Sequence, residues 1–332
     1  MRYSATQRVL KGMSDRVKGY LTDARWALSR GPGWKVNSDT AAMYPDRSLL
    51  EHWSEHGWVL LKKSVSEEAV RKLNDSIRVF REKRRGGYDE YGHGMRVGLL
   101  HVANRSSLRV AMNPQVIGFL KTIWEDDPVL FGSLTFDIGS EQEPHIDAAF
   151  FYTRPEDAMV GVWTALEDIH EDSGPLFYID RSHRLPRLYA SEVLEAHKGL
   201  REEVGNMEKA VDLQLSDRVY SAYSAYLADR IEHMSLKKVP ALIEKGDVFI
   251  WHGWTVHGGL PRTDRRLSRK SMVAHFMGSN ATFWNQHEFF LRGKSLDKKR
   301  AQKFRYRYYG NHRYVKYDDA VTFESGDGHF EA

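Results

Sequence analysis

Six short runs rich in β-branched and aromatic residues constrain the fold of this chain more than any other feature. Gly, Pro, Asp and Ser separate the runs, and these residue types favour turns between strands. Several short strands with turn signals between them predict a mainly β domain, either a barrel or a double-sheet jelly roll. The runs cover residues 129–138, 145–153, 160–166, 176–179, 247–251 and 270–277.

Helical patterns precede and interrupt the strands. Apolar residues recur every three or four positions over residues 5–29, which predicts an amphipathic helix. Residues 66–80 combine a serine N-cap, two acidic residues and one apolar face, as expected at a helix start. Residues 184–240 are also predicted to be helical. An insertion of that length between strands is either a lid over a site or an addition that widens the core.

These patterns predict three parts. We expect an N-terminal amphipathic helical extension over residues 1–48 and a β domain over residues 49–280, which contains the helical insertion at about 184–240. Residues 281–332 are expected to form a basic, aromatic C-terminal extension.

The sequence contains no cysteine. Disulfides, thiolate metal sites and cysteine nucleophiles are therefore excluded, and any metal must be held by His, Asp or Glu. No segment approaches the roughly 18 consecutive apolar residues of a membrane span. The first 30 residues also lack the apolar core of a signal peptide. These features predict a soluble, cytoplasmic protein.

The net charge of +4 is unevenly distributed, because Lys and Arg concentrate in residues 1–36 and 294–316, where Tyr and Phe lie between them. Such ends suit an anionic membrane surface, a phosphorylated substrate or nucleic acid. Solvated helix faces are the simpler interpretation. We expect a small-molecule substrate, anionic or lipid-linked, with peripheral membrane contact through the basic ends. Nucleic acid is not expected as a partner, and the chain is expected to be a monomer or a homodimer.

The motif with the clearest chemistry is His145-Ile146-Asp147, in the second run. Side chains alternate faces along a strand, so His145 and Asp147 are predicted to project to the same side, about 7 Å apart. A second imidazole from a distant strand would complete the two nitrogens and one oxygen that non-haem Fe(II) oxygenases use. On its own, the pair is also compatible with a histidine whose tautomer the carboxylate fixes.

Residues 245–259 supply a candidate for that second imidazole, because they read as a turn, a buried strand and a histidine at the next turn. His252 and His257 are an odd number of residues apart, so a regular strand turns only one of them inward. His257 precedes a Gly pair that lets the backbone pass close to a bound group. We therefore predict that His257 is the ligand.

Arg269 directly precedes the last run and is followed at alternate positions by Ser271, Val273 and His275. Strand alternation predicts that these side chains share an inward face. An arginine inside a barrel is costly unless it meets an anion, and its guanidinium fork suits a carboxylate. Arg269 is therefore a candidate anion-binding residue.

In their order along the chain, these motifs resemble those of the phytanoyl-CoA dioxygenase family of Fe(II)/2-oxoglutarate-dependent oxygenases. The resemblance covers about residues 50–280 and implies a double-stranded β-helix core of the jelly-roll, cupin-like type, flanked by N-terminal helices and a helical insertion. The matching motifs are His145-x-Asp147, residues 162–168, residues 173–176, Ser182-His183-Arg184, Lys245-Gly246-Asp247, His257-Gly258 and Arg269-Lys270.

The resemblance also implies roles for individual residues. It implies that His145, Asp147 and His257 hold Fe(II), and that Arg269 pairs with the distal carboxylate of 2-oxoglutarate. By the same comparison, Trp163 lines the co-substrate pocket.

Further co-substrate contacts are implied from neighbouring positions. Thr135 or Ser133 is expected to hydrogen-bond 2-oxoglutarate from the adjacent strand. Many members carry a hydroxylated residue at the position of Gly259, so Ser271 is expected to supply the missing hydroxyl.

The residues after the metal motif are candidates for the substrate pocket. Phe150, Phe151 and Tyr152 come three to five residues after Asp147, and we expect Phe150 and Tyr152 to contact substrate. Aromatic residues of the plain core are the alternative interpretation.

The activity that the resemblance implies is hydroxylation of an unactivated C–H bond of a small organic substrate. The expected cofactor is Fe(II), the expected co-substrates are 2-oxoglutarate and O2, and succinate and CO2 are released. Asp147 fills the coordination position that a halogenase leaves to chloride, which favours hydroxylation over halogenation. Desaturation and ring closure share the same oxidant. Two other classes stay open: a jelly-roll metalloenzyme for isomerisation or hydrolysis, which leaves Arg269 without a role, and a non-catalytic binding protein on this scaffold.

Overall fold

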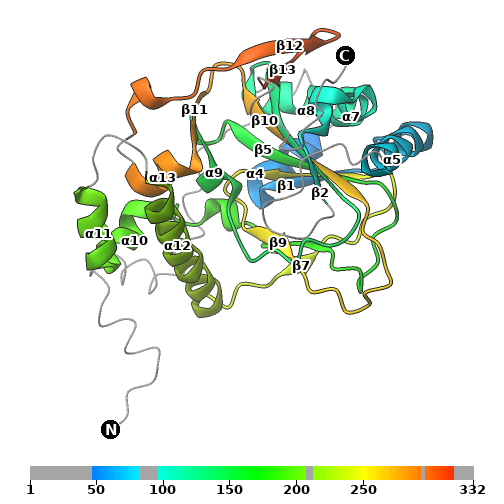
Figure 1. Cartoon of the computed structure of the whole chain (residues 1–332). Coiled ribbons are helices and arrows are strands. Elements are labelled where there is room, and N and C mark those ends of the chain that lie inside the picture. The colour runs from blue at the N-terminus through cyan, green and yellow to red at the C-terminus, as the bar shows by residue number, and fades with distance from the viewer. Residues whose placement is uncertain (1–46, 83–95, 207–211, 293–295, 318–332) are drawn as a thin grey trace.

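The computed structural model describes residues 47–82, 96–206, 212–292 and 296–317, and the helix predicted over residues 5–29 lies outside them. The largest element in these residues is an eight-stranded sheet (Figure 1). Its strands pair antiparallel, apart from the parallel pair of β13 and β3. In spatial order they are β1 (Trp58–Leu61), β8 (Val248–His252), β5 (Met159–Ala165), β10 (Ser271–Gly278), β3 (Pro128–Phe136), β13 (His312–Lys316) and β12 (Arg305–Tyr309), with β2 (Arg96–Gly98) also paired to β3.

A smaller sheet packs against the inner face of the large one. Leu176 and Tyr178 of the smaller sheet share a buried apolar cluster with Trp163, Phe249 and Val273 of the large sheet. Two mainly antiparallel sheets packed face to face confirm the predicted jelly-roll core. The additional strands are β7 (Val239–Pro240), β6 (Leu176–Tyr178) and β9 (His257–Gly259) in the smaller sheet, and β4 (Phe151–Arg154) and β11 (Thr282–Asn285) in a separate pair.

The N-terminal helices cover the outer face of the large sheet (Figure 1). Their apolar faces, including Leu73 and Phe119, pack on the outward side chains of β5, β8 and β10. The N-cap prediction for the helix after Ser66 is confirmed, because the Ser66 hydroxyl accepts a hydrogen bond from the amide of Ala69. The helices are α4 (Arg47–His56), α5 (Glu67–Glu82), α6 (Leu100–Ala103), α7 (Arg105–Ala111) and α8 (Pro114–Trp124).

The predicted helical insertion is also confirmed. It contains a short 3-10 turn, η1 (Ser182–Arg184), and three helices that pack with α13 on the other side of the molecule (Figure 1). In the longest of these helices, Tyr220 contacts Phe150 with a ring-centroid distance of 5.3 Å. The insertion therefore touches the segment that carries the metal motif, while its role as a lid stays a prediction. These helices are α10 (Ala190–Ala196), α11 (Lys198–Gly205), α12 (Leu213–His233) and α13 (Gln286–Arg292).

Five of the six predicted runs form strands whose ends differ by one or two residues from the prediction, and the run 145–153 is the exception. Asp147 begins a one-turn helix, α9 (Asp147–Phe150), and the strand β4 starts only at Phe151. The amide of Ala148 donates to the carbonyl of Gly253, and the amide of Ala149 donates to Ile146, which closes a turn instead of extending a ladder. The prediction of a continuous strand was therefore wrong after Ile146.

The basic, aromatic segment near the C-terminus begins with a 3-10 turn, η2 (Lys298–Arg300). The strands β12 and β13 follow and form a hairpin at one edge of the large sheet (Figure 1). Tyr308 of β12 is 67% exposed. The predicted domain boundaries and the membrane contact of the basic ends stay predictions. In the described part of the chain, each helix is too short or too polar to cross a bilayer.

Candidate metal centre

The backbone brings the two predicted histidines side by side. His145, just before α9, forms an antiparallel bridge with His257 at the start of β9. The amide of His145 donates to the carbonyl of His257 at 2.9 Å, and the amide of His257 donates back at 3.1 Å. The two imidazole rings are consequently only 4.2 Å apart between centroids.

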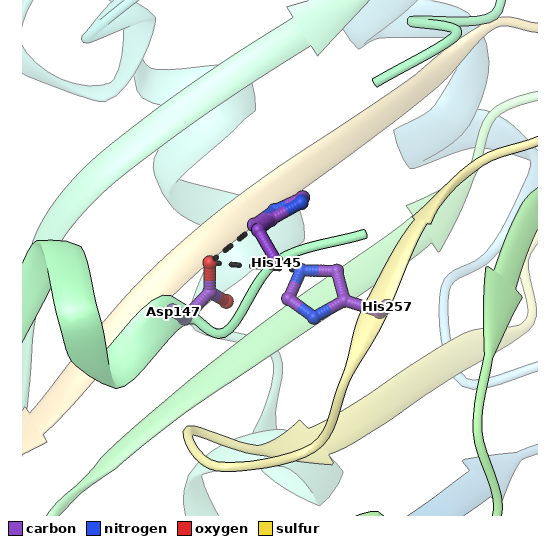
Figure 2. A group of neighbouring side chains, drawn as sticks. All are labelled: His145, Asp147 and His257. Carbon is purple, nitrogen blue, oxygen red and sulfur yellow. Dashed lines mark ion pairs between the residues drawn. The ribbon is translucent and has the colours of Figure 1, made fainter. Parts of the chain in front are cut away.

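Asp147 completes the group from the first turn of α9 (Figure 2). Its Oδ1 lies 3.6 Å from Nε2 of His257 and 3.9 Å from Nε2 of His145. One ligand atom from each of the three residues lies within 4.8 Å of the others, and all three side chains are buried. The two imidazoles and one carboxylate can therefore reach a single ion.

Hydrogen bonds to the backbone fix the orientation of both imidazoles. Nδ1 of His145 lies 2.8 Å from the carbonyl of Glu143, and Nδ1 of His257 lies 3.0 Å from the carbonyl of Thr255. A carbonyl only accepts, so each Nδ1 carries the proton and each Nε2 directs its lone pair toward Asp147. This is the usual way in which a protein prepares a histidine as a metal ligand.

The electrostatics of the site also suit a cation. Burial, with repulsion by His257, lowers the pKa of His145 to about 3, so its ring is neutral near pH 7. Burial opposes ionisation of Asp147, but the neighbouring His257, His275 and His145 outweigh it and lower the pKa of this carboxyl below its ordinary value. A neutral imidazole and an ionised carboxylate are the protonation states that bind a divalent metal.

Arg269 lines the same cavity, which has a volume of about 210 Å³. The side chain is 3% exposed, and its Cζ lies 5.1 Å from the ring centroid of Phe136 and 5.6 Å from that of Trp163. The nearest acceptors of its Nη1 and Nη2 are the Ser271 hydroxyl at 3.3 Å and the Ile138 carbonyl at 3.4 Å, both at the long limit of hydrogen bonding.

Arg269 and Trp163 each bring a donor without an acceptor to this cavity. Among the described residues, Nε of Arg269 and Nε1 of Trp163 are buried without a hydrogen-bond partner. Burial, with repulsion from Arg96, lowers the pKa of Arg269 to about 9. A carboxylate placed here would satisfy the donors and offset the cost of the buried charge, so these residues fit the distal end of 2-oxoglutarate.

Five polar residues of the cavity were not predicted as site residues: Arg96, Ser140, Gln142, His275 and Gln286. Arg96 of β2 lies over the Phe136 ring that Arg269 also contacts, at 5.1 Å. Strand alternation after Arg269 does indicate an inward His275. Arg96 stands in a Gly-rich stretch without apolar periodicity, so the sequence carries no signal for its position.

Four predicted residues, Ser133, Thr135, Tyr152 and Ser271, are not among those that line the cavity, although the Ser271 hydroxyl lies 3.3 Å from Nη1 of the cavity-lining Arg269. Ser133 and Thr135 lie on the opposite face of β3 from the cavity-lining Leu134 and Phe136. The Ser133 hydroxyl contacts Nδ1 of His101 at 2.7 Å, and that of Thr135 donates to a backbone carbonyl of β2. These contacts correct the expectation that either residue binds co-substrate.

Tyr152 is the third of these residues, because α9 shifts the alternation that the sequence predicted. Its ring is fully buried against Phe289 and Trp284, and its hydroxyl donates to Glu156. Phe150 does line the cavity, together with Phe151. Phe151, and not the expected Tyr152, therefore lines the cavity beside Phe150.

His252, the competing histidine, lies outside this cavity. Its Nε2 is 3.2 Å from Oδ1 of Asp157, and its Nδ1 accepts a hydrogen bond from the amide of Trp254. The odd spacing from His257 thus separates the two rings as expected.

Solved structures with this fold include metal-dependent enzymes. The chain is similar to the epimerase SnoN solved with Fe3+, alpha ketoglutarate and nogalamycin RO, with a TM-score of 0.57 and 17% identity over 83% of this chain and 98% of that one. It is also similar to EctD from S. alaskensis with bound Fe, with a TM-score of 0.53 and 13% identity over 76% and 85% of the two chains. These similarities concern the fold.

The fold and the donor set together place the chain in the class of Fe(II)/2-oxoglutarate-dependent oxygenase-type enzymes. The family model described as Phytanoyl-CoA dioxygenase (PhyH) matches residues 53–271, well over half of the chain. The chain belongs to this family. Its curated relatives include "Phytanoyl-CoA dioxygenase domain-containing protein 1" of Danio rerio, which is 29% identical over 67% of this chain and 72% of that protein. The protein of the same name from Mus musculus is 25% identical over 64% of this chain and 68% of that protein.

Proposed function

We propose that this chain is an Fe(II)- and 2-oxoglutarate-dependent dioxygenase that hydroxylates an unactivated C–H bond of a small organic substrate. The observation that carries the proposal is the convergence of His145, Asp147 and His257 on one point of a cavity that also contains the buried guanidinium of Arg269. The metal ligands and the anion-binding group are separate parts of one site. Family membership supports the same activity.

Each residue has a separate task in this proposal. Nε2 of His145, Nε2 of His257 and Oδ1 of Asp147 hold Fe(II). Arg269, with Trp163 beside it and Ser271 next to its Nη1, binds the distal carboxylate of 2-oxoglutarate. When bound, iron and 2-oxoglutarate supply the oxidising chemistry: one atom of O2 enters the C–H bond as a hydroxyl, and the other enters succinate as 2-oxoglutarate loses CO2.

Apolar side chains keep water away from this chemistry. Phe150 and Phe151 line the cavity beside the metal ligands, and the ring of Phe150 lies 5.9 Å from that of His145. The ring of Tyr220 of α12 packs edge-to-face against that of Phe150. We propose that these rings form the wall against which the substrate is oriented, with Phe150 nearest to the reacting carbon.

Oxygenation accounts for more of the site than the alternatives do. A jelly-roll isomerase or hydrolase would use the three metal ligands but would leave Arg269 buried without a function. A non-catalytic binding protein would need neither group. Among the similar structures are an epimerase and the carbocyclase SnoK, so epimerisation and ring closure are outcomes to be tested against hydroxylation for this chain.

The substrate class, location and assembly remain proposals. A second guanidinium in the cavity, that of Arg96, and the basic segment around β12 favour an anionic or lipid-linked molecule. Such a substrate agrees with the acyl thioester in the name of the family. We further propose that the protein acts in the cytoplasm as a monomer or homodimer.

The proposal is tested by anaerobic titration of the purified protein with Fe(II) and 2-oxoglutarate. We expect the metal-to-ligand charge-transfer absorption of a chelated 2-oxoglutarate, followed by succinate and CO2 when O2 is admitted. His145→Ala should lose the absorption band. His101→Asn is the control, because His101 is also buried but lies outside the cavity, and it should keep the band. A wild-type protein that shows no band and forms no succinate would contradict the proposal.

A further inference from the structure

One row of residues across the large sheet alternates glycine with a ring side chain. Gly132 of β3 pairs with His275 of β10, His275 pairs with Gly161 of β5, and Gly161 pairs with Trp251 of β8. A Cβ at Gly161 would lie 2.2 Å from Cε2 of Trp251, which is closer than side chains approach one another. The indole of Trp251 therefore occupies the space that any other residue at position 161 would fill.

The two rings of this row reach the metal-binding carboxylate. Nε1 of Trp251 donates a hydrogen bond of 2.9 Å to Oδ2 of Asp147, and Nε2 of His275 lies 3.7 Å from the same oxygen. The other oxygen, Oδ1, is the atom that faces His145 and His257. The two carboxylate oxygens thus have different partners, one in the triad and one in the sheet.

Trp251 also contacts a second member of the triad. Its ring centroid lies 4.7 Å from that of His257, and its side chain is 1% exposed. The smaller sheet carries His257 and the large sheet carries Trp251. The indole consequently fixes the position of Asp147 relative to both sheets.

We propose that Trp251 is a positioning residue that keeps Asp147 as a ligand through Oδ1 alone, and that Gly161 is required because it makes room for the indole. This inference rests on the proposed function and concerns residues outside the metal ligands. Without the indole N–H, the carboxylate is free to rotate away from the orientation in which Oδ1 faces His145 and His257.

The simpler role for Trp251 is to fill the core between the sheets, and a matched substitution separates the two roles. Trp254 is also buried, and its Nε1 donates a hydrogen bond of 3.0 Å to the backbone carbonyl of Glu156. Glu156 is not one of the three candidate metal ligands. Trp251→Phe and Trp254→Phe each remove one buried indole N–H. Only the first removes the hydrogen bond to Asp147.

The measurement is metal affinity, read from the absorption of added Co(II), together with the charge-transfer band of anaerobic Fe(II) and 2-oxoglutarate. We expect Trp251→Phe to weaken metal binding about 10- to 100-fold, as loss of a group that orients a ligand usually does, and to shift or weaken the band. Trp254→Phe should bind Co(II) within about twofold of wild type. Equal affinity in both variants would overturn the inference.

Gly161→Ala tests the same contact from the opposite side. The added methyl group must displace the indole, so we expect weaker Co(II) binding in the wild-type background. In the Trp251→Phe background the hydrogen bond is already absent, so the added methyl should weaken binding much less, which a double-mutant cycle detects. Equal losses in the two backgrounds would show that Gly161 acts independently of Trp251 and would overturn its assigned role.

These results are distinguishable from failure of the proposed function. Wild-type protein that forms the charge-transfer band while Trp251→Phe behaves like Trp254→Phe overturns only the role of Trp251. Wild-type protein that binds neither Co(II) nor Fe(II) overturns both proposals. If Gly161→Ala does not fold, the comparison of the two tryptophan variants still decides the role of Trp251.

Discussion

Arg269 and Arg96 place two guanidinium groups around one aromatic ring, Phe136, inside a small cavity. Like charges at such short range repel, and burial removes the water that would screen them. Both effects lower the pKa of Arg269 to about 9. An anion in the cavity would relieve both costs, so the residue is better suited to binding than to stabilising the fold.

Arg269→Lys tests this interpretation at the scale of one residue. The ammonium group keeps the charge but loses the planar fork that matches a carboxylate. We expect the Kd of 2-oxoglutarate to rise about 10- to 100-fold, equivalent to about 1.4–2.8 kcal/mol, in calorimetric titrations of the Mn(II)-loaded protein. The affinity for Mn(II) alone should not change, because Arg269 is not a metal ligand.

Arg266→Lys is the matched control for that experiment. Arg266 is an exposed arginine that pairs with Asp264 outside the cavity, so its substitution should leave 2-oxoglutarate binding unaltered. If Arg269→Lys binds 2-oxoglutarate as tightly as this control does, Arg269 is not the anion-binding residue.

At the residue scale, the sequence predicted the parts of the site that depend on spacing. The His-x-Asp pair, the odd separation of His252 and His257, and the alternation after Arg269 each follow from the period of a strand. Ser133 and Thr135, which the family resemblance implied, were placed wrongly because the resemblance did not fix which face of their strand is inward. Trp251 was missed because its partners, Gly161 and Asp147, come from distant segments that only the register brings together.

At the scale of elements, a polar network links the segment before β5 to β8 and to the start of the helical insertion. Asp157 receives a hydrogen bond from Arg187, and its Oδ1 lies 3.2 Å from Nε2 of His252. Arg187 also lies over the ring of Trp254, at 5.0 Å. The network joins three segments that are separate in the sequence.

The protonation of Asp157 should make this junction sensitive to acid. Burial alone would raise its pKa, but the hydrogen bond and charge of His252 and the charge of Arg187 lower it to about 2. A folded-state pKa below the unfolded value stabilises the fold above about pH 4, and this contribution is lost as the pH falls toward about 2. Each pKa unit corresponds to about 1.4 kcal/mol.

Asp157→Asn should therefore lower the free energy of unfolding by about 2 kcal/mol at pH 7. The difference from wild type should shrink as the pH falls from about 4 to about 2, where wild-type Asp157 itself becomes protonated. Urea denaturation at several pH values measures this. Asp75→Asn, which changes an exposed carboxylate of α5, should have little effect. A pH-independent difference for Asp157→Asn would show that charge is not the cause.

The elements themselves were predictable where one local signal dominates. The strands and the N-cap at Ser66 were predicted because each has its own period or capping residue. The one-turn helix α9 was not, because the sequence after His145 is apolar and aromatic and reads equally as strand. A contact from Gly253, more than a hundred residues away, decides that conformation.

At the scale of the whole molecule, the metal ligands and the anion-binding residue tie together parts of the fold that are otherwise separate. Asp147 belongs to α9, His257 to the smaller sheet, and Arg269 stands just before β10 of the large sheet. The sequence predicted that these segments meet through the resemblance of their ordered motifs and not through any local pattern. Because the unfolded chain cannot hold the ligands in this arrangement, a bound metal should stabilise the folded state.

Thermal denaturation tests that coupling. Mn(II) at about 100 times its Kd should stabilise the wild-type protein by about 2.7 kcal/mol, which raises Tm by about 4 °C for a chain of this size. Adding 2-oxoglutarate should raise Tm further, because it binds only the folded, metal-loaded site. His145→Ala should lose both increases, whereas Arg269→Ala should keep the first and lose most of the second, since it removes the anion-binding group and leaves the metal ligands in place. Equal increases in wild type and His145→Ala would mean that Mn(II) binds elsewhere on the chain, and the three ligands would then not form the metal site.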